Sequence, residues 1–149
     1  MAEPALSKGT MSQVAFVVKD IEKAAKIWAE ALGLDAPKWI ITDTADTAHT
    51  LYKGKPTEAR AKLAFLNLGQ VTIELIEPVG GPSTWLDGLK TGGVHHIAFN
   101  VQDADAAGAA LAEQGMKVIQ TGDYTGGRYV YIDASAQLGT VLELLAKRP

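Results

Sequence analysis

Hydrophobic residues near the start of the chain follow first a strand pattern and then a helix pattern. Residues 13–18 are apolar and rich in β-branched side chains, which predicts a strand. Over 21–32 the apolar side chains recur at helical spacing and gather near one face. Asp20 stands where an N-cap residue accepts free backbone N–H groups, and Gly33 is suited to ending the helix. The pattern therefore predicts a strand followed directly by a capped helix.

The same pattern returns later in the chain. When the sequence is shifted by 83 residues, 13–20 falls on 96–103, and a second capped helix is predicted over 104–114. Four positions are identical in the two copies of the strand and cap: Ala15, Phe16, Val18 and Asp20. The stretch 69–76 also resembles 139–145, with one residue gained or lost. Two matched blocks in the same order indicate an internal repeat.

Short apolar runs complete each copy of the repeat. They predict three more strands per copy, at 39–42, 62–67, 71–77, 117–120, 128–133 and 141–145. The polar stretch 43–60 has weak periodicity, so we expect a connector there. The predicted order is β-α-β-β-β, twice, which gives a single α+β domain over 1–149. Its modules are expected at 11–79 and 94–146, joined by a linker at 80–93.

Composition narrows the range of functions. The 149 residues are 47% hydrophobic and 21% charged, as in an ordinary globular domain, and the net charge of −3 argues against nucleic acid or an anionic membrane as partner. The absence of cysteine excludes disulfides, thiolate metal sites and cysteine nucleophiles. No apolar run reaches the length of a membrane span, and the first residues lack the features of a secretory signal. We therefore expect a soluble, cytoplasmic protein that acts on a small molecule.

Four polar residues interrupt the predicted apolar strands at positions that the repeat makes equivalent. Gln13 and His96 begin the first strand of each copy, and Glu74 and Glu143 lie within the last. Each alone has an ordinary explanation, such as a glutamate on a wet face or a structural histidine. A pseudo-twofold axis would bring all four together. One imidazole, two carboxylates and one amide oxygen form a mixed set suited to Zn²⁺, Ni²⁺, Co²⁺, Fe²⁺ or Mn²⁺.

These features resemble the vicinal oxygen chelate superfamily, which includes glyoxalase I, methylmalonyl-CoA epimerase, extradiol dioxygenases and bleomycin resistance proteins. The resemblance covers Gln13 to Leu145 and rests on the strand–Asp–helix openings, the paired glutamate strands and the run Gly93-Val94-His95-His96-Ile97-Ala98-Phe99. It implies that the two βαβββ modules form a cup-shaped mixed β-sheet around one divalent metal ion. The ligands implied by the resemblance are Gln13, Glu74, His96 and Glu143.

Two branches of the superfamily share the resemblance. The stretches 64–78 and 92–97 look most like the epimerases, whereas Gln, Glu, His, Glu in that order is the ligand set of the eukaryotic type of glyoxalase I. Enzymes of both kinds move a proton α to a carbonyl, and the metal stabilises the enolate. The resemblance implicates Glu143 as the base. We expect a homodimeric isomerase, epimerase or lyase acting on a thioester, hemithioacetal or keto acid.

Several further positions are open to more than one interpretation. Arg128, Tyr131 and Arg60 are candidates for binding substrate, although a hairpin turn and a solvated face would also account for the two arginines. The candidates for a second acid or base are Glu58, Asp123, Tyr129 and Tyr131. Because successive strand residues point to opposite faces, His95 is expected to make structural contacts rather than to join His96 in the site. Trp85 is expected to pack a helix.

The sequence is also compatible with two other classes of function. A non-catalytic protein that sequesters a small molecule would share the fold, but such a cup needs no buried carboxylates. An iron-dependent dioxygenase would favour two histidines and one carboxylate, which Gln13 does not match. Metal content of the purified protein separates the enzyme from the sequestering protein.

Overall fold

The computed structural model describes residues 4–6 and 9–148; the ends of the predicted domain at 1–3 and 149, and residues 7–8, lie outside the described residues. Two stretches have the predicted β-α-β-β-β order. The first comprises β1 (Thr10–Val17), α1 (Ile21–Leu32), β2 (Ile40–Ile41), β5 (Arg60–Asn67) and β6 (Thr72–Val79). The second comprises β7 (Val94–Asn100), α4 (Ala104–Glu113), β8 (Lys117–Tyr124), β9 (Gly127–Ala134) and β10 (Thr140–Lys147).

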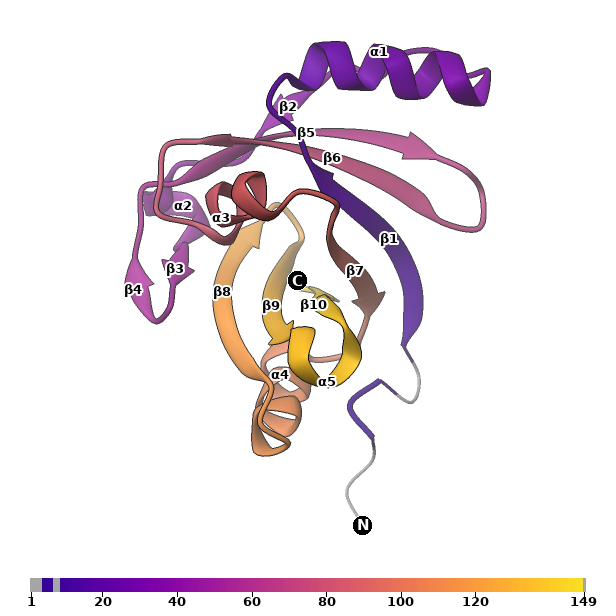
Figure 1. Ribbon diagram of the computed structural model, residues 1–149. Helices are drawn as coiled ribbons and strands as arrows, with labels where there is room; N and C mark the ends of the chain where they lie inside the picture. The colour runs from indigo at the N-terminus through magenta and orange to yellow at the C-terminus, as the bar shows by residue number, and fades with distance from the viewer. Residues whose placement is uncertain (1–3, 7–8, 149) are drawn as a thin grey trace.

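All the strands in the described part of the chain join one curled sheet. Its order is β2-β5-β6-β1-β7-β10-β9-β8-β3-β4 (Figure 1). The two halves have the same internal pairing, because β1 runs parallel to β6 as β7 runs parallel to β10. The halves meet where β1 pairs antiparallel with β7. This mixed α+β sheet confirms the predicted fold class, and its central pair is formed within a single chain.

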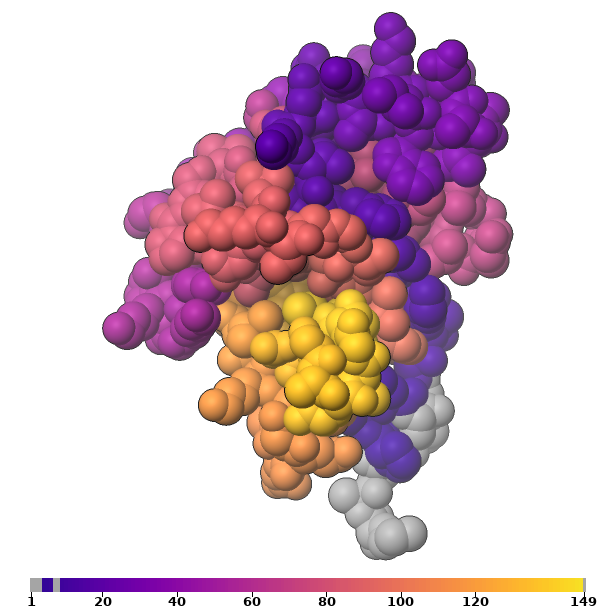
Figure 2. All heavy atoms as spheres, in the orientation of Figure 1, coloured from indigo at the N-terminus to yellow at the C-terminus, as the bar shows by residue number. Residues whose placement is uncertain are grey.

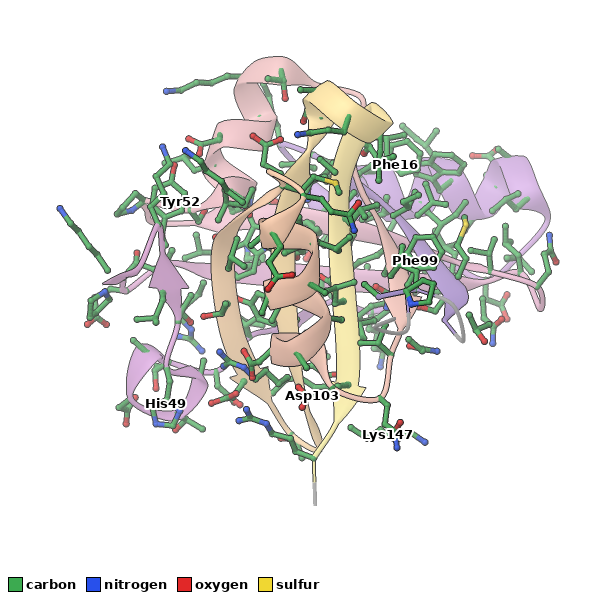
Figure 3. The ribbon with its side chains drawn as sticks, turned by 90° about the horizontal axis from the view of Figure 1, so that it is seen from below. Phe16, His49, Tyr52, Phe99, Asp103 and Lys147 are labelled. Carbon is green, nitrogen blue, oxygen red and sulfur yellow. The ribbon has the colours of Figure 1, made fainter. Side chains whose placement is uncertain are left out.

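Each long helix covers the outer face of its own half of the sheet. The equivalent caps Asp20 and Asp103 accept from the backbone N–H of the third residue beyond them, at 3.1 and 3.0 Å. The equivalent residues Phe16 and Phe99, labelled in Figure 3, pack in the separate apolar clusters beneath the two helices. Since side chains alternate along a strand, the residues between these apolar ones point to the concave face.

The connector has structure that the sequence pattern did not predict. It forms α2 (Ala45–Ala48) and a hairpin of β3 (Leu51–Tyr52) and β4 (Lys55–Pro56). The hairpin pairs with β8 of the second half rather than with its own half, and Figure 2 shows its purple atoms beside the orange ones. His49 Nδ1 lies 2.9 Å from Asp123 Oδ2, and the Tyr52 hydroxyl donates to Asp87. The connector therefore fastens the first module to the second.

Two more helices lie outside the predicted elements. The linker contains α3 (Thr84–Thr91), which begins after Ser83, whose hydroxyl accepts from the N–H of Leu86 at 2.9 Å. A single turn, α5 (Ser135–Leu138), precedes β10. Among the described residues, no helix is long and apolar enough to cross a bilayer.

Candidate metal centre

The strand register brings the four sequence-predicted positions to one face of the sheet. Ala15 of β1 is paired with Glu74 on β6 and with His96 on β7. In the same way, Ala98 of β7 is paired with Gln13 on β1 and with Glu143 on β10. Paired residues in a ladder share a face. The two fully buried alanines, themselves equivalent in the repeat, leave open space between the polar side chains.

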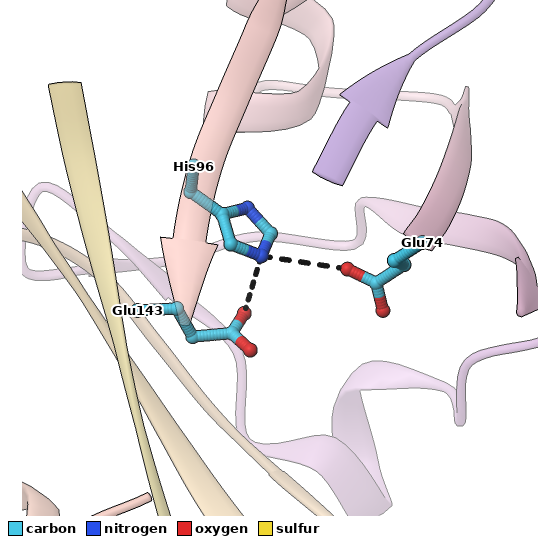
Figure 4. A group of neighbouring side chains, drawn as sticks. All are labelled: Glu74, His96 and Glu143. Carbon is cyan, nitrogen blue, oxygen red and sulfur yellow. Dashed lines mark ion pairs between the residues drawn. The ribbon is translucent and has the colours of Figure 1, made fainter. Parts of the chain in front are cut away.

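Three of the four polar side chains are buried and converge closely. His96 Nε2 lies 3.5 Å from Glu74 Oε1 and 3.5 Å from Glu143 Oε2 (Figure 4). One ligand atom from each of these residues lies within 4.8 Å of the others. His96 is 0% exposed, Glu74 6% and Glu143 4%. Neither glutamate therefore lies on a solvent-exposed face of the sheet, where a charged side chain would need no further explanation.

The burial of these groups disfavours their charged forms. Desolvation raises the pKa of Glu74 well above its usual range, and the Glu143 charge adds to that rise. Desolvation also raises the pKa of Glu143 to about 7, although a hydrogen bond from Tyr131 opposes the shift. The pKa of His96 falls well below its usual range for the same reason. A buried pair of carboxylates therefore needs a compensating cation to be ionised at neutral pH.

The unpaired polar atoms fit a divalent cation. Gln13 Oε1, Glu74 Oε1 and His96 Nε2 are buried and have no hydrogen-bond partner among the described residues. Buried polar atoms without partners are rare in folded proteins, so three at one place require an explanation. All are lone-pair donors of the kinds that bind Zn²⁺ and the neighbouring divalent transition metals. The residues present therefore fit the metal ion that the resemblance implied.

His95 does not lie on the opposite face from His96. Phe16 pairs with Val94 and Ala15 with His96, so His95 is an extra residue in β7. Such a bulge turns the side chain of the extra residue out of the regular alternation. His95 Nδ1 lies 2.7 Å from His96 Nδ1, and His95 Nε2 lies 3.1 Å from the carbonyl oxygen of Thr84. The alternation rule was wrong here because the strand is not regular.

A cavity of about 370 Å³ opens beside the polar cluster, and Gln13, Glu74 and Glu143 line it. Its walls are apolar and aromatic, with contributions from both modules and the connector; they include Ile40, Leu63, Phe65, Tyr124, Tyr129 and Leu145. This volume and lining are typical of small-molecule sites. Trp85 also lines the cavity, and its Nε1 donates to the Tyr131 hydroxyl at 3.0 Å. The sequence expectation missed this contact because α3 was not predicted.

The candidate substrate-binding residues separate into two groups. Tyr131 is buried and lines the cavity. Arg128 is not among the lining residues: its guanidinium is bound by Asp105 at 2.9 Å and Asp123 at 3.1 Å. Arg60 does not line the cavity either, and donates twice to the carbonyl oxygen of Thr42. The structure thus brings the tyrosine to the cavity and ties the two arginines to other groups.

The candidates for a second acid or base also differ in position. Glu58 is exposed and does not line the cavity. Asp123 lines it, but contacts with His49 and Arg128 hold its pKa below the usual range. Tyr129 and Tyr131 line the cavity, and burial raises the pKa of both phenols, so they stay protonated. Each phenol can therefore donate a hydrogen bond.

Two equivalent βαβββ halves around a buried cluster of nitrogen and oxygen ligands define a class of metal-binding protein with a small-molecule cup. The chain belongs to the Glyoxalase/Bleomycin resistance protein/Dioxygenase superfamily, whose family model matches residues 12–132. This confirms the resemblance to the vicinal oxygen chelate proteins.

Characterised relatives are epimerases. The chain is 32% identical to a 2-epi-5-epi-valiolone epimerase of Actinomyces sp, over 89% of this chain and 76% of that protein. It is 32% identical to the ethylmalonyl-CoA/methylmalonyl-CoA epimerase of Cereibacter sphaeroides, over 77% of this chain and 78% of the relative. The match to mitochondrial methylmalonyl-CoA epimerase of Bos taurus, at 27% identity, spans only 61% of that protein. These relatives confirm the prediction of an enzyme of this superfamily.

A solved structure shares the fold at lower sequence identity. The methylmalonyl-CoA epimerase of Mycobacterium tuberculosis superposes with a TM-score of 0.66 at 22% identity, over 100% of this chain and 94% of that chain. The likeness supports the cup-shaped arrangement of the sheet.

Proposed function

We propose that this protein is a metal-dependent epimerase that removes and returns the proton on a carbon next to a carbonyl group. The observation that carries the proposal is the convergence of Glu74, His96 and Glu143 beside a small-molecule cavity that both glutamates line; Glu74 Oε1 and His96 Nε2 have no hydrogen-bond partner among the described residues. Gln13, whose amide oxygen is also unpaired, would complete a four-residue ligand set. When bound, a divalent ion there would act as a Lewis acid and stabilise negative charge on the carbonyl oxygen.

Glu143 is the base in this proposal. Its side chain borders the cavity, and a bound cation would favour its ionised form, which is the form that accepts a proton from the substrate. Burial keeps the Tyr131 hydroxyl protonated, so this phenol, which accepts from Trp85, can donate its hydrogen to the Glu143 carboxylate.

Epimerisation needs a second group that delivers a proton to the opposite face of the same carbon. We assign this role to Glu74, which also borders the cavity and comes from the other half of the sheet. The internal repeat relates Glu74 to Glu143, so the two carboxylates reach a substrate carbon from opposite halves. Asp123 is a poorer choice because His49, Arg128 and Arg148 occupy its oxygens.

Two substrate classes follow from the relatives: carboxylated acyl-CoA thioesters and cyclic polyhydroxy ketones. Among the residues that the structure describes, the charged side chains that line the cavity are all acidic: Asp43, Glu74, Asp123 and Glu143. Two of these carboxylates would neutralise the divalent ion, so the lining offers no further positive charge to a substrate carboxylate. Hydroxyls of Thr42, Thr50, Thr125 and three tyrosines line the same cavity. This lining favours an uncharged hydroxyketone.

The test is solvent deuterium exchange with protein supplied with Co²⁺, Ni²⁺, Zn²⁺ or Mn²⁺. Methylmalonyl-CoA and 2-epi-5-epi-valiolone are incubated separately in deuterium oxide, and mass spectrometry and chiral analysis follow label and configuration. We expect label at the α carbon of both epimers of the hydroxyketone, abolished by a chelator. In Glu74→Gln, label should enter one epimer without inversion, because Glu143 alone remains. Label entering neither substrate, or entry unaffected by metal removal, would contradict the proposal.

The predicted homodimer stays a prediction. All four proposed ligands come from one chain, because the β1–β7 pair that unites the two halves is intramolecular. A second copy is therefore not needed to supply a ligand.

A further inference from the structure

The histidine next to the proposed ligand has no role in the chemistry described so far, although it is buried and polar. His95 is 8% exposed, and both of its ring nitrogens have partners within the protein. One nitrogen contacts the ring of His96 and the other contacts the backbone of α3. Because both ring nitrogens of this buried imidazole have partners, its hydrogen-bonding pattern determines which nitrogen of the neighbouring His96 ring carries the hydrogen.

The hydrogen positions follow from what each partner can do. The carbonyl oxygen of Thr84 can only accept, so the Nε2 of His95, 3.1 Å away, carries the hydrogen. A neutral His95 then has a lone pair on Nδ1. The contact of 2.7 Å with Nδ1 of His96 requires one donor, so His96 must carry its hydrogen on Nδ1. The lone pair of His96 is then on Nε2, the atom that faces Glu74 and Glu143.

We propose that His95 is a positioning residue for the metal ion: it accepts the Nδ1 hydrogen of His96 and thereby keeps Nε2 of His96 free and correctly aimed to bind the ion. This inference rests on the metal site of the proposed function. Metal-bound histidines commonly donate their other N–H to a neighbouring acceptor, which sets the tautomer, the ring orientation and the basicity of the ligand.

The rest of the fold holds His95 in place. His95 is the extra residue of a bulge in β7. The bulge lets the adjacent side chains of His95 and His96 meet instead of pointing to opposite faces. Thr84 is anchored in turn, because its N–H donates to Gln120 Oε1 at 2.8 Å. On α3, a Cβ at Gly88 would lie 2.8 Å from Cδ2 of His95 and 3.0 Å from Val17, so only glycine leaves room for the ring. Helix α3 therefore supports the site from behind.

The experiment compares three variants by Co²⁺ binding and by visible absorption of the bound Co²⁺. His95→Phe keeps a ring but removes the acceptor, and His95→Asn can place an amide oxygen near the position of Nδ1. Ser12→Ala is the matched control, because Ser12 is the extra residue of β1, equivalent to His95, and its hydroxyl donates to the carbonyl of Ala98, at 3.4 Å, rather than to a proposed ligand. Thermal unfolding of each metal-free variant establishes that it is folded.

We expect His95→Phe to weaken Co²⁺ binding about 10–100-fold and to change the absorption bands. His95→Asn should recover most of the affinity, and Ser12→Ala should match the parent protein. A folded His95→Phe variant with the parent's affinity and spectrum would overturn the inference.

Nitrogen NMR of the metal-free parent protein tests the tautomer without any metal. We expect the His96 hydrogen on Nδ1, and finding it on Nε2 would also overturn the inference. If the parent protein binds no Co²⁺ at all, the proposed function fails, whereas the NMR result still decides whether His95 sets the tautomer.

Discussion

The two halves of the sheet have the same framework but different side chains at the centre. In each half, a bulge comes directly before the first proposed ligand: Ser12 before Gln13 and His95 before His96. The ladders place one alanine and one glutamate beside these ligands in the same relative positions. The framework therefore supplies four convergent positions whatever residues occupy them.

The difference lies in how each half supports its ligand. In the second half, an imidazole is backed by a second imidazole and by the carbonyl of Thr84. In the first half, the amide oxygen of Gln13 has no hydrogen-bond partner among the described residues, and the hydroxyl of Ser12 donates to a backbone carbonyl. Glu143 also has Tyr131 beside it, a partner that the structure gives to the second half. The internal repeat thus positions the four proposed ligands, and the side chains around them, which differ between the halves, give the ligands different proposed roles.

The largest expected effect is from Glu143→Gln, which keeps volume but removes a negative ligand and the proposed base. Turnover on any substrate found should fall about 10²–10⁴-fold, the usual contribution of a general base. The measurement is the steady-state rate with saturating metal. If Glu143→Gln keeps full activity with its metal bound, Glu143 is not the base and the two halves are not specialised as described.

Substitution of the alanines tests the shared framework. Ala15→Val and Ala98→Val each add bulk to a fully buried position between two proposed ligands. Overpacking of this kind costs about 1–3 kcal/mol of unfolding free energy, and metal binding should weaken in both variants. Denaturant unfolding and Co²⁺ titration measure the two effects. Tight Co²⁺ binding by either valine variant would show that these alanines do not leave the space for the ion.

Metal affinity should depend on pH in a direction set by the buried carboxylates. Burial raises the pKa of Glu143 to about 7, so below that pH a proton must leave before the ion binds. The pKa of Glu74 is raised by burial as well, so affinity should fall as pH decreases by about tenfold per pH unit for each displaced proton, and Glu143→Gln should have the shallower slope. Calorimetry in buffers of different ionisation enthalpy counts the protons released. A flat profile from pH 5.5 to 7, or the same slope in Glu143→Gln, would contradict this assignment.

The smallest effect is expected from Gln13→His, which replaces one neutral ligand by another. Because neither side chain carries the proton in the proposed reaction, metal should be retained and much of the activity kept. Metal analysis and the deuterium exchange rate measure this. A loss as large as that of Glu143→Gln would mean that the first half carries a catalytic task of its own.

The sequence predicted what depends on local pattern and on the repeat. The helix over 21–32 has the predicted bounds because Asp20 caps it and Gly33 adopts a left-handed conformation at its end. The register that gathers the glutamates followed from equivalence between copies rather than from local propensity. Strands β5, β9 and β10 extend beyond their predicted ends, since ladder pairing continues past the apolar residues, whereas β2 is shorter than predicted.

What the sequence pattern missed depends on contacts between distant segments. The hairpin of the connector turns at Lys53 and Gly54, both with positive φ, but Lys-Gly is a weaker turn signal than Asn-Gly. Its partner β8 is far along the chain. Ser83 was available as an N-cap for α3, a signal that could have been used. The bulge at His95 has no local signature, so the pairing of the two imidazoles required the structure.

The most direct measurement is a titration of metal-free protein with Zn²⁺ by calorimetry, followed by thermal unfolding with and without the ion. We expect one ion per chain and a higher melting temperature, equivalent to a stabilisation of about 2.7 kcal/mol when free Zn²⁺ is a hundred times the dissociation constant. His96→Leu should abolish both effects, and Ser12→Ala should keep them. Absence of Zn²⁺ binding in the parent protein, or binding that survives in a folded His96→Leu variant, would contradict the four-residue metal centre.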